Sequence, residues 1–445
     1  MNNISLRKRI CSKAGGTAIL LASSPVLLAG PVVGPPPAPD TTPTWAEQEA
    51  QNNEMSVFIP STEAVRKDEP FVLGPLTFRP HVDYDVTYAT GLLLNNTNTA
   101  LGTNTPTANT HDSWIQTIRP GISIDIGKHW TLDYTPTLVY YSDHNFSDQL
   151  NHSASLSGAT DYGDWVLGLT QTFTLDSSLQ SQTASQTETR EFTTGLTGLY
   201  TINERMSLDL AVNQDLNYVT GFVDSMDWST MDWLNYSFWK RLSVGVGVGG
   251  GYVVLSRDPA APGGTPEPGN QYYQDLQGKV NWRATDKLSL SLNAGFENRH
   301  FDASGATPST TSLTPIYGAS IEYLPFKHTQ LGLSASQTVN SSDYSVESQS
   351  EINTTVSLSL NQRLLEKFYL DLSASYTEID YRESFNGFGN ANRTDKDYSF
   401  NARLTRQVFK RGSIAVHYQY TDYQSTQPGF TYDSNQVGLE LNYSY

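Results

Sequence analysis

The sequence is poor in cysteine, in charged residues and in long apolar runs, and each shortage excludes a class of protein. Among 445 residues, 16% are charged and one is a cysteine. No apolar run of about 18 residues occurs, so a bundle of membrane-spanning helices is excluded. The one cysteine, Cys11, lies in a segment that we expect to be removed on export, so the mature chain would hold neither a disulfide nor a cysteine-ligated metal.

Aromatic and small polar residues are abundant instead. The chain contains 25 Tyr, 17 Phe and 8 Trp, too many for a disordered protein, and it lacks the Lys, Glu, Ala and Leu excess of helical proteins. The net charge is −17 and no basic stripe occurs, so nucleic acid is not an expected partner and cationic ligands are favoured over anionic ones. Composition therefore indicates a large all-β protein.

The N-terminal part has the features of an export signal. Four basic residues and no acid lie among the first thirteen positions, and the apolar stretch that follows is too short to span a bilayer. We predict a signal peptide over residues 1–29. Residues 30–74 include the proline-rich run PVVGPPPAPDTTPT and are predicted to form a periplasmic extension, the alternative being a plug inside the domain that follows. Residues 75–445 form that domain.

From about residue 76, apolar and polar residues alternate, which predicts β-strands with one apolar and one polar face. In 288–296, for example, Leu, Leu, Leu, Ala and Phe alternate with Ser, Ser, Asn and Gly. Short turns alternate with longer polar loops along the chain. The predicted turns are 127–129, 161–164, 203–205, 240–241, 285–287, 325–328, 364–367 and 409–412. The predicted loops are 91–111, 143–149, 177–189, 220–226, 257–270, 302–311, 341–346, 382–395 and 424–430.

These eight turns and nine loops separate eighteen strands, and less regular alternation in 147–160 and 226–238 leaves sixteen open. Membrane strands need ~9–11 residues whereas soluble strands average ~5–6, and the alternating segments here have the greater length. Closure removes the sheet edges and satisfies the backbone in lipid. We therefore predict a transmembrane antiparallel up-and-down β-barrel in the cell outer membrane, with short periplasmic turns and longer extracellular loops.

Aromatic residues near the predicted strand ends favour a membrane setting, because two aromatic belts mark the two interfaces of a transmembrane barrel. Those near the short turns are Trp130, Trp165, Trp239, Trp282, Tyr323, Phe368 and Phe409. Those near the long loops are Tyr88, Trp114, Tyr140, Tyr218, Trp228, Tyr252, Tyr272, Phe301, Tyr381 and Tyr420.

Several short motifs carry a resemblance to a known family. They are Gly74-Pro75-Leu76 with Pro80, Arg119-Pro120-Gly121, the run IGKHWTLDYTP over 126–136, Tyr140-Tyr141-Ser142, Phe146, Asp148 and His152. On these residues the chain, over roughly 75–445, resembles the β-barrel porins of Gram-negative outer membranes, in particular the OmpL-like group. The resemblance implies location and architecture more than mechanism. The aromatic-ended terminus Leu439, Leu441, Tyr443 and Tyr445 is similar to the signal that the barrel assembly machinery reads, which makes that machinery an expected partner.

If the apolar face contacts outer-membrane lipid, the polar face lines the lumen. The predicted lumen-lining residues are Arg79, His81, Asp83, Asp85, Asp125, Asp133, Asp209, Asp215, Asp275, Lys279, Arg283, Glu297, Glu322, Asp371, Arg403, His417 and Glu440. Most are acidic, which favours cations. The alternative is that these charges pair across neighbouring strands. Gly245, Gly247, Gly249 and Gly251 share this face; a folded-in segment lies against them, or a wide lumen simply tolerates small residues.

No catalytic or metal-binding motif stands out. The eight histidines are dispersed, and H-E-x-x-H, G-x-S-x-G and GK[ST] are all missing, so we expect neither an enzyme nor a cofactor. The sequence predicts a porin-like channel for passive diffusion of small hydrophilic solutes with a cation preference. One alternative is an export conduit for a polysaccharide or another polymer that works with periplasmic partners. Another is a structural or adhesive barrel plugged by loops 91–111, 177–189 or 257–270. Whether copies associate into a homo-oligomer is left open.

Overall fold

A single antiparallel sheet dominates the computed structural model, which describes residues 71–94, 109–261, 267–304, 308–343, 348–365, 367–384 and 393–445. The predicted signal peptide and most of the predicted extension lie outside these residues. The long strands are β2 (Leu76–Leu93), β3 (Thr110–Ile126), β4 (Trp130–Tyr141), β5 (Gln149–Tyr162), β6 (Trp165–Asp176), β9 (Thr189–Asn203), β10 (Met206–Val219), β11 (Val223–Trp239), β12 (Leu242–Arg257), β13 (Gln271–Thr285), β14 (Leu288–Phe301), β15 (Thr310–Phe326), β16 (Thr329–Ser341), β17 (Ser348–Leu364), β18 (Phe368–Ser384), β19 (Thr394–Phe409), β20 (Gly412–Ser425) and β21 (Tyr432–Ser444).

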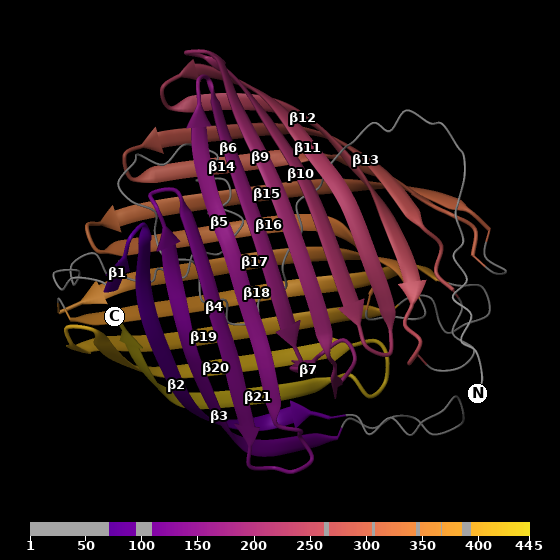
Figure 1. Cartoon of the computed structure of the whole chain (residues 1–445). Helices are drawn as coiled ribbons and strands as arrows, with labels where there is room; N and C mark the ends of the chain where they lie inside the picture. The colour runs from indigo at the N-terminus through magenta and orange to yellow at the C-terminus, as the bar shows by residue number, and fades with distance from the viewer. Residues whose placement is uncertain are drawn as a thin grey trace, which may run out of the picture.

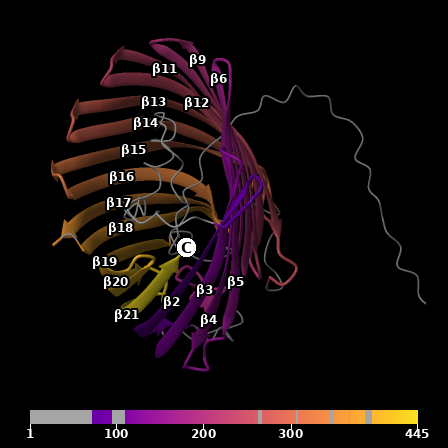
Figure 2. The same ribbon diagram turned by 60° about the vertical axis from the view of Figure 1, so that its left-hand side comes forward.

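Each long strand pairs with its neighbours in the chain, and β2 pairs with both β3 and β21, which closes the sheet into a barrel. Figures 1 and 2 show the strands side by side around this wall. The sheet has 19 strands, of which the three-residue β1 (Phe71–Leu73) is an addition to β2, so 18 strands form the barrel. The prediction of eighteen is confirmed, and the two less regular segments form β5 and β11.

The outer face of the wall is apolar. Exposed side chains such as Val246, Leu276, Leu292, Leu358 and Val416 come from strands all round the barrel. Exposed aromatic side chains flank them at both ends, among them Trp239 and Trp282 near short turns and Trp114, Trp228 and Tyr252 near long loops. An apolar band between two aromatic girdles is the surface that a transmembrane barrel needs.

Two residues of the predicted aromatic belt were assigned wrongly. Phe301 and Tyr381 are only 1% and 3% exposed. Phe301 pairs with Gln271 and Tyr381 with Glu351, both of which are buried side chains. A position near a strand end does not fix the direction of a side chain, because successive residues point to opposite faces. These two rings therefore belong to the interior of the barrel.

Polar residues fill much of this interior, and apolar packing within it is local. One buried cluster joins Val223, Val253, Leu255 and Tyr273, and another joins Ala89, Leu92 and Phe146. Both lie toward the long-loop ends of their strands. The described residues contain no helix that is both long and apolar enough to cross a bilayer.

Candidate functional site

The candidate site is the polar face of the wall, which surrounds the lumen. Residues paired across neighbouring strands share a face. The register therefore puts every predicted lumen-lining residue on the face opposite the apolar band: Arg79, His81, Asp83, Asp85, Asp125, Asp133, Asp209, Asp215, Asp275, Lys279, Arg283, Glu297, Glu322, Asp371, Arg403, His417 and Glu440. Their role in permeation stays a prediction.

One group of these residues lies where the barrel closes, on β19, β20, β21, β2 and β3. His417 Nε2 lies 2.7 Å from Asp85 Oδ2, and Arg403 donates to Glu440 over 2.7 Å. Asn442 donates to Asp83, whose side chain faces that of Arg119 across β2 and β3. Charged side chains from the two ends of the domain thus meet in one network. The sequence alone did not predict this pairing, because Asp85 and His417 are 332 residues apart.

A second group lies on β2, β3 and β4. Arg79 forms an ion pair with Asp125, while Ser123 and Thr135 both donate to Asp133. These contacts support the alternative in which lumen charges pair or accept hydrogen bonds across neighbouring strands. Asp215 and Asp275, however, form no ion pair within the described part of the chain. Pairing therefore accounts for part of the acidic set.

The glycine stripe of β12 makes room for large side chains of its neighbours. A β-carbon at Gly247 would lie 2.6 Å from the Trp233 ring, and one at Gly251 would lie 2.6 Å from the Tyr273 ring. Lys279 Nζ stands 4.3 Å from the centroid of the Trp233 ring and 3.5 Å from Asp209. Neither sequence interpretation anticipated this arrangement, in which side chains of β11 and β13 cover the stripe.

Toward the long-loop ends of the strands, a cluster of charged side chains joins β11, β13 and β14. Arg299 donates to Glu297 over 2.6 Å and to Gln271 over 2.9 Å, and it lies 4.4 Å from the centroid of the Tyr273 ring. Tyr273 donates to Asp227 over 2.9 Å. Sequence reasoning missed Arg299, Tyr273 and Asp227, as it missed Arg119 and Trp233. Strand parity could have found them, because each is an even number of residues from a predicted lumen residue on its own strand or faces one across a pair.

The loop between β6 and β9 reaches across the long-loop end of the lumen. We call residues 177–188 the strap; it contains the small hairpin β7 (Leu179–Gln180) and β8 (Ser185–Gln186). The hydroxyls of Ser181 and Tyr432 are 2.6 Å apart, and Arg393 donates to the Gln182 carbonyl over 3.1 Å. Because Tyr432 begins β21 and Arg393 precedes β19, the strap is tied to a distant part of the wall.

Arg393, which anchors the strap, is itself held by several side chains of the wall. Its guanidinium pairs with Asp395 at 2.6 Å, and Asp395, which is fully buried, also accepts a hydrogen bond from Tyr423 over 2.6 Å. The same guanidinium lies 4.2 Å from the centroid of the Phe430 ring. Of the three predicted plug loops, 177–189 therefore does extend inward; the central parts of 91–111 and 257–270 lie outside the described residues.

A second inward contact comes from the segment that follows β16. Asp343 accepts hydrogen bonds from Asn217 over 2.8 Å and from Ser225 over 2.7 Å. Its carbonyl accepts from the Val223 N–H over 3.2 Å. Burial raises the pKa of Asp343, against the opposing effect of these donors. The long-loop end of the lumen is thus narrowed from two sides.

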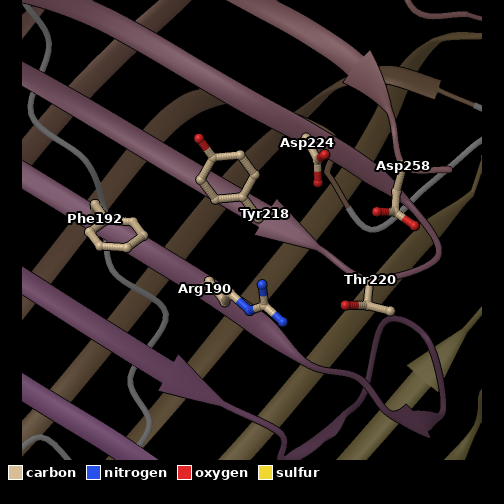
Figure 3. A pocket seen from close by; sticks show the side chains of 6 residues that line it. All are labelled: Arg190, Phe192, Tyr218, Thr220, Asp224 and Asp258. Atoms are coloured by element: carbon tan, nitrogen blue, oxygen red, sulfur yellow. The ribbon is translucent and has the colours of Figure 1, made fainter. Parts of the chain in front are cut away.

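One surface hollow lies outside the lumen. A cavity of about 380 Å³ is lined by Arg190, Phe192, Tyr218, Thr220, Asp224 and Asp258. Figure 3 shows these side chains, which come from the long-loop ends of β9, β10 and β11 and from the residue after β12. Phe192 and Tyr218 belong to the outer, exposed face, so this cavity is separate from the candidate channel.

A closed barrel with an apolar outer face, two aromatic girdles and a polar interior defines an outer-membrane β-barrel protein. Residues 269–445 match the family model described as "Putative beta-barrel porin 2", and the resemblance to β-barrel porins is confirmed. The protein is accordingly located in the outer membrane. No curated protein matches the chain in sequence.

Solved structures with a related arrangement share little sequence with the chain. OccAB4 from Acinetobacter baumannii is 12% identical, with 82% of this chain and 98% of that chain covered and a TM-score of 0.42. OpdO from Pseudomonas aeruginosa is 12% identical, with 83% and 97% covered and a TM-score of 0.42. The siderophore receptor PirA from Pseudomonas aeruginosa is 8% identical, with 82% and 80% covered and a TM-score of 0.41.

Proposed function

We propose that the protein is a water-filled channel through which small hydrophilic solutes diffuse passively, with a preference for cations. The observation that carries this proposal is the charge of the lumen face, where acidic side chains from β2, β3, β4, β10, β13, β14, β15, β18 and β21 outnumber basic ones. An acid-lined passage concentrates cations and repels anions. Barrels of ~16–18 strands generally leave an aqueous channel.

The two inward segments support a limit on solute size. The strap and Asp343 narrow the long-loop end, while the mid-height wall is lined by short Ser and Thr side chains such as Ser334, Thr355 and Ser375. A passage narrowed at one end admits small solutes and excludes polymers. This arrangement favours diffusion over the export of a polysaccharide.

Swelling of liposomes that contain the refolded protein tests the proposal. Lysine should enter faster than glutamate, a small sugar should enter at an intermediate rate, and a dextran should stay outside. Deletion of residues 31–70 should leave these rates unchanged, whereas an export conduit that docks periplasmic partners through that segment would lose transport. A folded, heat-modifiable barrel that admits no solute would contradict the proposal and favour a plugged structural barrel.

A further inference from the structure

The cavity of Figure 3 lies on the outer face of the wall, at the long-loop ends of β9, β10 and β11. Phe192 and Tyr218 are 36% and 41% exposed on that face, and Arg190 pairs with Tyr218 across β9 and β10. Its volume of about 380 Å³ is within the range that small-molecule sites have. The cavity is therefore large enough for a ligand and opens toward the membrane.

The lining changes from aromatic to charged along the strands. Phe192 lies two residues deeper on β9 than Arg190, and its ring centroid is 4.7 Å from that of Phe173 on β6. Asp224 is the second residue of β11 and Asp258 follows β12, so both lie next to the loops. Figure 3 shows the two labelled rings on one side and the two carboxylates on the other. This gradient matches a molecule with an apolar body and a polar head.

The two carboxylates are held in place by backbone groups of the short loops. Asp224 Oδ1 accepts the Val219 N–H over 3.1 Å. Asp258 Oδ1 accepts the Gly221 N–H over 3.0 Å and the Ala260 N–H over 2.7 Å. Within the described part of the chain, Oδ2 of neither carboxylate accepts a hydrogen bond. Two fixed negative charges thus stand ready for a cationic group without a further cost of ordering.

A guanidinium lies among the same lining residues. Arg190 Nη2 donates to Glu188 over 2.5 Å, and the Arg190 side chain is 59% exposed. A guanidinium has five N–H donors, so this contact leaves donors for another acceptor. Arginine suits phosphate oxygens in particular, because its planar fork binds two of them at once.

We propose that this cavity binds a membrane amphiphile whose head group carries both a phosphate and an ammonium, as phosphoethanolamine does. The ammonium lies against Asp224 and Asp258, the phosphate accepts from Arg190, and the apolar chain follows Phe192 down the wall. A head group with a phosphate alone would be repelled by the carboxylates, and one with an ammonium alone would leave Arg190 unused. The proposal does not depend on what passes through the lumen.

Native mass spectrometry of the refolded full-length protein in a nonionic detergent tests the site. Dihexanoyl phosphatidylethanolamine should bind saturably, with one molecule per barrel. Dihexanoyl phosphatidylglycerol lacks the ammonium and a dihexyl dimethylammonium salt lacks the phosphate, so each should bind about tenfold more weakly or less. The absence of saturable binding, or equal binding of phosphatidylethanolamine and either comparator, would overturn the proposal.

Substitutions that keep the local hydrogen bonds locate the binding in this cavity. Asp224→Asn combined with Asp258→Asn retains a side-chain oxygen for the loop N–H groups and removes both charges, and Arg190→Gln removes the guanidinium. Each change should weaken binding of phosphatidylethanolamine by about tenfold or more. Asp112→Asn is the matched control, because Asp112 accepts the Gly91 N–H over 3.0 Å at the long-loop end of β3 but does not line the cavity.

Heat-modifiable mobility identifies the variants that have folded as barrels. Unchanged affinity in the folded cavity variants, or an equal loss in the Asp112→Asn protein, would show that the lipid binds elsewhere on the wall and would refute the proposal.

Discussion

At the scale of single residues, Gly247 shows how the lumen accommodates large side chains. The ring of Trp233 and the methyl group of Met231 occupy the space that a β-carbon would need. Lys279 is held above that ring and beside Asp209. Gly247 therefore leaves the space in which the Trp233 ring lies, and this ring helps to hold the Lys279 ammonium group on the lumen face.

Gly247→Ala should destabilise the barrel by about 1–3 kcal/mol, because the new methyl group would lie 2.6 Å from Met231 and Trp233. Gly278→Ala is the control, since the nearest heavy atom to its added methyl group is 3.9 Å away. Urea unfolding followed by tryptophan fluorescence measures both. Equal effects of the two substitutions would argue against close packing over the stripe.

Asp343 makes stability depend on pH with an unusual sign. It lies beyond the end of β16, and burial raises its pKa above the ordinary value of 3.8. The folded state then binds the proton more tightly than the unfolded state, so its contribution to stability is present below pH 3.8 and is lost as pH rises through the folded pKa. Each unit of pKa shift corresponds to about 1.4 kcal/mol. Asp343→Asn should remove this dependence, as urea unfolding across acidic pH would detect.

Asp143 provides the matched control of opposite sign. The backbone N–H of Asn145 donates to its carboxylate over 3.0 Å and lowers its pKa, so its contribution is present above its unfolded pKa and is lost as pH falls. Asp143→Asn should therefore weaken the loss of unfolding free energy at acidic pH. Unlike Asp343→Asn, it should not raise the unfolding free energy at neutral pH. Identical profiles for the two variants would contradict the assigned environments.

At the scale of elements, the strap is a described segment that reaches across the long-loop end of the lumen. Its contacts join residues 211 and 251 positions apart in the sequence. Replacing residues 179–186 by four glycine and serine residues should raise the single-channel conductance, because the hairpin and its anchors disappear from the long-loop end. Planar-bilayer recording of the refolded variant measures this increase.

Substitutions at Arg393 distinguish release of the strap from destabilisation of the barrel wall. Arg393→Met removes the donor to Gln182 and leaves buried Asp395 uncompensated, which should cost about 3–5 kcal/mol of stability. Arg393→Met combined with Asp395→Asn should recover most of that stability and still show the raised conductance. The three variants are the replacement of 179–186, Arg393→Met alone and Arg393→Met with Asp395→Asn. If all three keep the parental single-channel conductance, the strap does not narrow the passage.

At the scale of the whole molecule, the sequence predicted the barrel well because alternation acts locally. Apolar and polar residues two apart report directly on the two faces of a strand, so all eighteen strands and the parity of the lumen residues could be inferred. The sequence named loop 177–189 as one of three candidate plugs but could not single it out, because the position of the strap depends on contacts with Arg393 and Tyr432 that have no local signature. Phe301 and Tyr381 were misassigned for a related reason, since aromatic character near a strand end was weighed above parity.

The central claim is that an acid-rich lumen conducts cations, and the reversal potential in a salt gradient tests it most directly. Refolded protein in a planar bilayer with unequal potassium chloride should conduct steadily, with the sign of the reversal potential that denotes cation preference. Asp83→Asn, Asp125→Asn and Asp209→Asn together should reduce that potential, whereas Asp232→Asn on the outer face should leave it unchanged. An anion-selective potential, or one that the triple substitution does not alter, would contradict the account.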